Sequence, residues 1–241
     1  MSATAPPPPP SLSSEPYVAV QIGVLDQAIV ESATDETNRK AQLTPTAARI
    51  RLQKLRPSVS EAIDLARARG RMASGTGVPS RMPGESALYV GSGAHAGDLA
   101  TLERFGIKGV LNLAPSVCKD PVAAYQARGI AYLELDARDD RSFPLLGTFL
   151  EPASSFINGV HADGGGVLCH CMAGVNRSAT IAVAHLMIRD RRELLALFAE
   201  CSASRPSILQ NPSFQLQLCV LAHRHGLLTS GSASEESDTA L

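Results

Sequence analysis

The chain has 241 residues, enough for one domain with extensions, and its 22 basic and 23 acidic residues leave a formal net charge of −1. This balance lacks the basic excess of a nucleic-acid-binding protein, and no apolar run is long enough to cross a bilayer. The five cysteines have no disulfide-framework spacing and follow no predicted signal peptide, so we expect reduced thiols in the cytoplasm or nucleus, without nucleic-acid or membrane partners.

Residues 1–83 are predicted to be an extension that precedes the domain. Pro6–Pro10 indicate a disordered, polyproline-type tail. Residues 39–71 carry nine Arg or Lys against two acidic residues, and their apolar residues recur at a spacing typical of short helices. The stretch 70–84 is rich in Gly, Ser and Pro and is interpreted as a linker.

Residues 84–225 alternate strand and helix patterns, and all ten Tyr and Phe except Tyr17 lie between residues 89 and 214. This predicts an α/β domain with a central, mostly parallel sheet flanked by helices. Strands are expected near 87–91, 109–113, 130–135 and 166–170, and helices near 97–105, 120–128, 145–161, 178–189, 192–203 and 212–224. Residues 226–241 are polar and are predicted to be a disordered tail.

The most informative stretch follows the last predicted strand. It reads HCMAGVNRS from His170 to Ser178, and an apolar helical pattern continues from there. A strand, a tight loop and a helix N-terminus in this order place backbone N–H groups and the positive end of the helix dipole around one anion-sized space. The same groups stabilise a thiolate, so Cys171 is predicted to be an ionised nucleophile. Arg177 can offer a planar, two-pronged donor to phosphate oxygens.

The other residues of this loop receive roles from their chemistry. Gly174 lets the backbone turn sharply and approach a ligand closely. Ser178 is placed to donate a hydrogen bond to Cys171 when the thiolate must leave, and His170 is expected to orient the loop without transferring protons. The predicted substrate-binding residues are Met172, Ala173, Gly174, Val175, Asn176 and Arg177.

Two other interpretations of this stretch are weaker. A structural cysteine before an ordinary core helix is disfavoured by the Gly, Arg and Ser that accompany it. A zinc site at Cys169–Cys171 is disfavoured because neighbouring strand residues point to opposite faces and no second ligand pair follows at zinc-site spacing.

Because of this loop, the chain resembles a protein tyrosine phosphatase of the dual-specificity kind. The family signature is His-Cys-x-x-Gly-x-x-Arg-Ser/Thr, and residues 170–178 match it at every fixed position. Further similarity lies in residues 88–92 (LYVGS), 105–113 (FGIKGVLNL), 205–206 (RP) and 211–214 (NPSF). The resemblance covers residues 84–225 and implies the fold and the chemistry of that family.

The resemblance implies a general acid on the loop that follows the strand expected at 130–135. Asp139 stands in the matching position, with Asp140 beside it and Asp136 near the end of the strand. In the implied reaction the Cys171 thiolate attacks phosphorus, Asp139 protonates the leaving oxygen, and water then hydrolyses the cysteinyl-phosphate. The implied activity is hydrolysis of phosphotyrosine and of phosphoserine or phosphothreonine in a protein substrate, and this mechanism needs neither a metal nor an organic cofactor.

Other substrate classes stay open at this point. Lipid phosphatases usually carry lysines in this loop, whereas residues 172–176 are uncharged, and glucan phosphatases have a Gly in place of Asn176. The 5′-triphosphatases of RNA capping share the Asn-Arg pair, but a more basic groove would be expected of them. A non-catalytic phosphoprotein-binding module usually lacks the Cys, Arg or Asp, and all three are present here.

Two hypotheses concern regulation and partners. Residues 49–55 (RIRLQKL) loosely resemble a docking motif for mitogen-activated protein kinases, although a solvated basic helix or linker is the commoner meaning of such a pattern. The second hypothesis is that Cys118 or Cys169 forms a protective disulfide with oxidised Cys171. The simpler interpretation is that Cys118 and Cys169 are ordinary buried or surface thiols. The oligomeric state is left open.

Overall fold

A computed structural model describes residues 44–54 and 77–228, which belong to one compact unit. A five-stranded sheet has the order β1-β2-β5-β3-β4, and every neighbouring pair is parallel except β1 with β2. The strands are β1 (Ser80–Arg81), β2 (Leu88–Ser92), β3 (Ile107–Asn112), β4 (Ala131–Glu134) and β5 (Gly166–Cys171). The predicted α/β fold with a mostly parallel sheet is confirmed.

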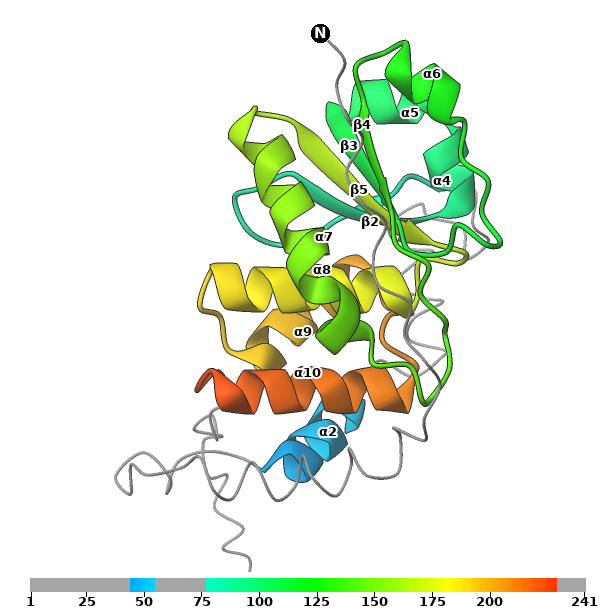
Figure 1. Cartoon of the computed structure of the whole chain (residues 1–241). Helices are drawn as coiled ribbons and strands as arrows, with labels where there is room; N and C mark the ends of the chain where they lie inside the picture. Colours follow the sequence, from blue (N-terminus) through cyan, green and yellow to red (C-terminus); the bar gives the residue numbers. More distant parts are fainter. Residues whose placement is uncertain (1–43, 55–76, 229–241) are drawn as a thin grey trace, which may run out of the picture. The chain divides into compact units, whose positions relative to one another are not determined.

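Helices cover both faces of the sheet (Figure 1). One face packs against α4 (Gly93–Gly97), α5 (Leu99–Arg104) and α6 (Val122–Gln126), and the other against α7 (Leu145–Ala162) and α8 (Arg177–Arg189). Alternating strand residues supply the two cores: Leu88 and Val90 face α7 and α8, whereas Tyr89 lies with Leu102 and Tyr125 on the opposite face. Burial on both faces explains why the strands read as continuous apolar runs.

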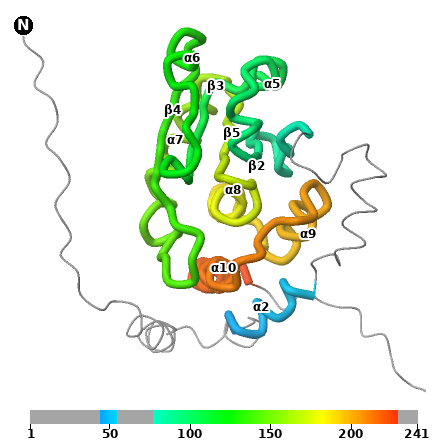
Figure 2. Tube along the Cα trace, turned by 90° about the vertical axis from the view of Figure 1, so that its right-hand side faces the viewer, coloured from blue at the N-terminus to red at the C-terminus, as the bar shows by residue number. Residues whose placement is uncertain are grey.

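Helix α8 is the centre of the helical layer below the sheet. Its residues Arg177–Met187 are all buried, because α7, α9 (Leu194–Ser204) and α10 (Pro212–Arg224) pack around it. Helix α2 (Pro45–Lys54) lies against α10 and α9, on the side away from the sheet (Figure 2). Ala48 and Leu52 of α2 are fully buried in this contact. The site at the start of α8 is therefore held by the best-packed helix of the described chain.

The structure differs from the sequence expectations at several element ends. Strand β1 falls in the segment interpreted as a linker, and its Ser80 is buried. Leu227 and Leu228, assigned to the polar tail, are also buried, because the Leu227 carbonyl accepts the N–H of Leu194 and anchors the segment to α9. Helix α6 begins two residues later than expected because Pro121 is its N-cap, and it ends at Gln126 instead of residue 128. The expected Pro-rich tail and the rest of the C-terminal tail lie outside the described residues.

Candidate active site

Cys171 lies at the end of the central strand β5, where the chain passes into the loop that leads to α8. This loop, residues 172–176, is called the catalytic loop below. Gly174 has a φ of +69°, and a Cβ at this position would collide with the carbonyl group of Gly91. Glycine alone avoids both problems. The predicted nucleophile thus sits at the carboxyl edge of a parallel sheet, which is the usual ligand site of open α/β folds.

The environment of the Cys171 thiol favours its ionised form. Burial has the largest influence on its pKa and raises it, but hydrogen bonds from Ser178, the charge of Arg177 and a hydrogen bond from Gly174 outweigh burial, so the pKa lies below the usual thiol value. The Ser178 hydroxyl donates to Cys171 Sγ at 3.4 Å. The pKa values of the other four cysteines are all raised, by burial first; they are Cys118, Cys169, Cys201 and Cys219.

Arg177 is buried at the N-terminus of α8, with 8% of its surface exposed. Its Nη1 donates a hydrogen bond to the carbonyl group of Ala137 at 3.0 Å. Its Nε is buried and has no hydrogen-bond partner among the described residues. A buried donor without a partner costs free energy, so this atom is suited to a ligand oxygen.

The catalytic loop turns its carbonyl groups outward. Four consecutive carbonyls accept hydrogen bonds from outside the loop: Met172 from the Gly93 N–H (3.3 Å), Ala173 and Gly174 from the Arg205 guanidinium (3.0 and 2.7 Å), and Val175 from the Leu209 N–H (2.8 Å). In a trans peptide the N–H points opposite to the carbonyl, so the N–H groups that follow face the interior of the loop. Inward-facing N–H groups of this kind form an anion-binding nest.

The side chains of the loop form the mouth of the site. Met172 is 64% exposed and Ala173 is exposed, whereas Val175 and Asn176 are half-buried. None of the loop residues 172–176 carries a charge. The positive charge at the centre of the site therefore comes from Arg177 and the backbone dipoles.

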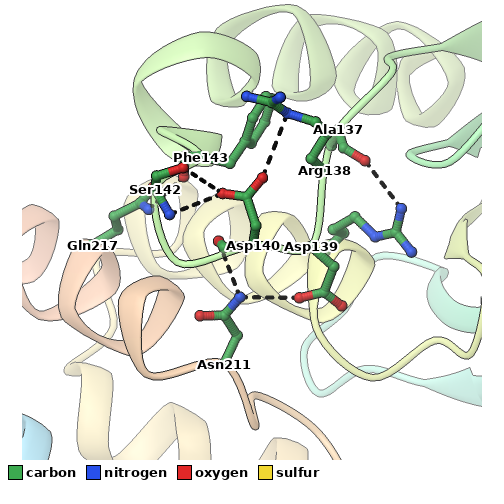
Figure 3. A network of polar contacts seen from close by, with 9 residues as sticks. Ala137, Arg138, Asp139, Asp140, Ser142, Phe143, Asn211 and Gln217 are labelled. Atoms are coloured by element: carbon green, nitrogen blue, oxygen red, sulfur yellow. Dashed lines mark hydrogen bonds and ion pairs between the residues drawn. The ribbon is translucent and has the colours of Figure 1, made fainter. Parts of the chain in front are cut away.

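Asp139 is the acidic residue that reaches the catalytic loop. Its carboxylate accepts hydrogen bonds from Asn176 Nδ2, at 3.1 and 3.2 Å. It also accepts one from Asn211 Nδ2, at 3.0 Å, which Figure 3 shows. Asp140 points into its own turn instead, where the Ser142 N–H and hydroxyl donate to it at 2.8 and 2.7 Å. Asp136 is exposed just after β4. Of the three candidates, Asp139 is the one bound to the catalytic loop.

His170 packs behind the nucleophile. Its Nε2 lies 2.7 Å from Oδ2 of Asp120, and both side chains are buried, at 0% and 2% exposure. Asn112 holds the segment before Asp120 in place, because its Nδ2 donates to the Cys118 carbonyl at 3.0 Å and its Oδ1 accepts the Ala114 N–H at 2.8 Å. The contact with Asp120 fixes the orientation of the His170 ring beside Cys171.

Three residues of the site received no role from the sequence. Asp120 sits in an irregular segment with no motif of its own. Arg205 and Asn211 belong to short segments that resemble the family, but nothing local indicates that they contact the catalytic loop and Asp139. Only the folded chain brings them there, since Asn211 is 72 positions from Asp139.

Within residues 44–54 and 77–228, the remaining cysteines and acidic residues form no metal-binding cluster. All five cysteines are free thiols, and Cys169 is fully buried with its Sγ hydrogen-bonded to the Ser178 carbonyl. The described segments contain no group of three or more His, Cys, Asp or Glu suited to a metal ion. Within the same segments, no helix combines the length and the apolar character needed to span a membrane.

Comparisons with known proteins agree with this geometry. The family model "Dual specificity phosphatase, catalytic domain" matches residues 88–224. Human dual specificity protein phosphatase 26 is 34% identical over 137 residues, which are 57% of this chain and 64% of the relative. Mouse dual specificity protein phosphatase 2 is 36% identical over 141 residues, which are 56% of this chain and 42% of the relative.

Solved structures show the same likeness. The crystal structure of human DUSP28 has a TM-score of 0.51 with 30% identity, and the match covers 60% of this chain and 99% of that protein. The chain therefore spans less than two thirds of the curated relatives in sequence, and nearly all of this solved relative in structure.

Proposed function

Because the chain belongs to the dual specificity phosphatase family, we propose that it is a protein phosphatase that hydrolyses phosphotyrosine and phosphoserine or phosphothreonine. The observation that carries the proposal is one pairing: the Cys171 thiol with its lowered pKa and the buried, unpartnered Nε of Arg177 meet at an anion-binding loop. Such a site binds a phosphate group beside a sulfur nucleophile and stabilises the charge that builds up on its oxygens.

The proposed reaction has two steps. The Cys171 thiolate forms a bond to phosphorus while the bond from phosphorus to the leaving oxygen breaks, and Asp139 gives its proton to that oxygen. Water then attacks the cysteinyl-phosphate, Asp139 takes a proton from the water, and the sulfur leaves as the thiolate. Ser178 stabilises that departing thiolate through its hydrogen bond. Arg177 and the loop N–H groups hold the other phosphate oxygens throughout.

The loop surface supports a protein substrate. A multiply charged lipid or nucleotide headgroup would favour cationic side chains on the loop itself, but residues 172–176 are uncharged and Met172 is 64% exposed at the mouth. An apolar rim suits the carbon skeleton of a phosphorylated side chain. The five free cysteines favour a reducing compartment, and we place the protein in the cytoplasm or nucleus.

A mitogen-activated protein kinase as the substrate remains a prediction. Residues 49–55, which resemble a kinase docking motif, include Leu52 of α2. The Leu52 side chain is fully buried against the rest of the domain, whereas Arg51 and Lys54 are exposed. A kinase that used Leu52 would therefore have to detach α2 from α10.

Phosphate release from a peptide phosphorylated on both Thr and Tyr tests the function. Wild-type protein should release phosphate from both positions, and Cys171→Ser should release none while still binding the peptide. A rapid acid quench of the Asp139→Asn variant should trap phosphate on Cys171. A folded, reduced wild type that releases phosphate from neither position would overturn the proposal and favour glucan, RNA or lipid phosphates or a binding role.

A further inference from the structure

Asn176, the residue immediately before Arg177, uses both ends of its side-chain amide. Its Nδ2 donates to Oδ1 and Oδ2 of Asp139 at 3.2 and 3.1 Å. Its Oδ1 accepts the backbone N–H groups of Gln210 and Asn211 at 2.7 and 3.0 Å. The reversed amide would place N–H groups against N–H groups, so these partners fix which end faces Asp139.

Asn211 approaches the same carboxylate from the segment before α10. Its Nδ2 donates to Oδ1 of Asp139 at 3.0 Å and to the carbonyl of Asp140 at 3.3 Å. Its Oδ1 accepts the Ser213 N–H at 3.0 Å and caps α10. This amide is also fixed at both ends, so two rigid donors converge on Asp139 (Figure 3 shows the one from Asn211).

We propose that Asn176, assisted by Asn211, is a positioning residue that holds Asp139 in its proton-donating place before the substrate arrives. This inference rests on the proposed phosphatase function. Asp139 is exposed, and an exposed carboxylate on a loop would otherwise sample many orientations. Asp139 lies in the loop between β4 and α7, residues 135–144, which is called the acid loop below. The Asn176 bond and the Arg177 bond to the Ala137 carbonyl attach this acid loop to the catalytic loop and to the first residue of α8.

The pattern of donors also assigns the two carboxyl oxygens. Oδ1 receives hydrogen bonds from both Asn176 and Asn211, whereas Oδ2 receives one, from Asn176. Oδ2 therefore has more lone-pair capacity free for a proton, so we assign the proton to Oδ2. This proton goes to the leaving oxygen when the bond between that oxygen and phosphorus breaks. The carboxylate that results keeps its amide donors, and Oδ2 takes the proton back from water in the second step.

The dependence of rate on the leaving group tests this role. Loss of a proton donor slows the departure of weakly acidic alcohols and phenols, but hardly affects a strongly acidic nitrophenol, which leaves without help. We expect Asn176→Ala to lower kcat/KM about 10-fold or more for a phosphoserine peptide and for phenyl phosphate, because kcat/KM reports the step in which the leaving oxygen departs and not the later hydrolysis. The kcat/KM for a dinitrophenyl phosphate should stay close to that of the wild type, and inorganic phosphate should inhibit both proteins equally.

Three further variants distinguish a positioning role of Asn176 from a general structural defect. Asn176→Asp keeps the acceptor for Gln210 and Asn211 but sets a carboxylate against Asp139, so it should show the same selective loss even if Asn176→Ala does not fold. In an Asp139→Asn background, Asn176→Ala should cause little further loss. Gln217→Ala removes a hydrogen bond to Phe143 of the same acid loop, at 2.9 Å, and should leave the leaving-group dependence unchanged.

The outcomes distinguish failure of the phosphatase function from failure of the positioning role alone. A wild type that is inactive on every compound of the series would overturn the phosphatase function and this inference with it. An active wild type whose Asn176 variants lose rate equally on all leaving groups, or on none, would overturn only the positioning role. Weaker phosphate inhibition in the Asn176 variants would likewise assign Asn176 to phosphate binding instead.

Discussion

The side chain of Gln215, fully buried on α10, donates a hydrogen bond to the carbonyl of Leu209 at 2.6 Å. Leu209 has a φ of +55°, which is uncommon for a residue with a side chain, and its own N–H donates to Val175 of the catalytic loop at 2.8 Å. Gln215 also accepts a hydrogen bond from Gln53 of α2 at 3.3 Å. A relay of three hydrogen bonds thus joins α2, α10 and the catalytic loop.

Replacement of Gln215 should affect both stability and turnover. Gln215→Ala leaves the buried Leu209 carbonyl without its donor, so we expect the free energy of unfolding to fall by about 1–3 kcal/mol. Because Leu209 then loses the contact that holds its left-handed conformation, Val175 is held less firmly and kcat should fall as well. Urea unfolding and kcat on an aryl phosphate measure the two effects. Unchanged kcat in a destabilised variant would contradict the relay.

The contact between α2 and the domain gives a second prediction. Leu52 is fully buried, whereas Ile50 on the same helix is 47% exposed. Leu52→Ala should lower the free energy of unfolding, or of local detachment of α2, by about 2–3 kcal/mol, and Ile50→Ala should change it by less than about 0.5 kcal/mol. Hydrogen exchange of α2 amides and urea unfolding measure this difference. Equal effects of the two variants would show that α2 does not pack as described.

Much of the fold was predictable because its signals are local. The apolar strands and the stretch from Cys171 through the catalytic loop to Ser178 are short and continuous, and their residue types determine their geometry. Strand β1, with two residues, and α4, a Gly- and Ala-rich turn, carry too little pattern to be predicted from propensity. They form because the sheet edge and the β2 end provide hydrogen-bond partners.

The residues of the site also differ in whether a local sequence signal predicts them. The proposed nucleophile Cys171, Arg177 and Ser178 lie within eight residues, and their roles could be predicted from residue types and spacing. Asp120 pairs with His170 across 50 positions, and Arg205 reaches the Gly174 carbonyl across 31. Such pairs depend on how the helices pack around the sheet, and a single sequence holds no local signal for them.

The hydroxyl of Ser178 leads to a prediction about pH dependence. Its hydrogen bond is the largest of the influences that lower the pKa of Cys171. Ser178→Ala should therefore raise that pKa, and the acidic limb of the kcat/KM profile, which reports the free enzyme, should move to higher pH. Ser178→Thr keeps a hydroxyl and should hold the limb near its wild-type position. Thiolate absorbance provides an independent titration, and an unmoved limb in Ser178→Ala would contradict the assignment.

His185 should make the domain sensitive to mild acid. It is buried on α8, its Nδ1 lies 3.1 Å from the Ser154 hydroxyl of α7, and its Nε2 has no partner among the described residues. Burial is the main cause that lowers its pKa to about 4; the charges of Arg189 and His161 act in the same direction, and Asp190 opposes them. The folded protein therefore holds this imidazole neutral where the unfolded chain would protonate it.

The sign of the effect follows from proton linkage. The unfolded chain binds a proton at His185 near pH 6.5 and the folded protein only near pH 4, so stability falls as the pH drops through that window, by at most about 3 kcal/mol. Above the unfolded pKa, His185 contributes no pH dependence. The pKa values of His95 and His161 are lowered as well and add to the same slope, so the measurement compares the wild type with a His185 variant.

Urea unfolding of His185→Gln from neutral pH to pH 5 should show a shallower loss of stability than the wild type. Identical slopes for the two proteins would mean that His185 does not titrate as its burial requires.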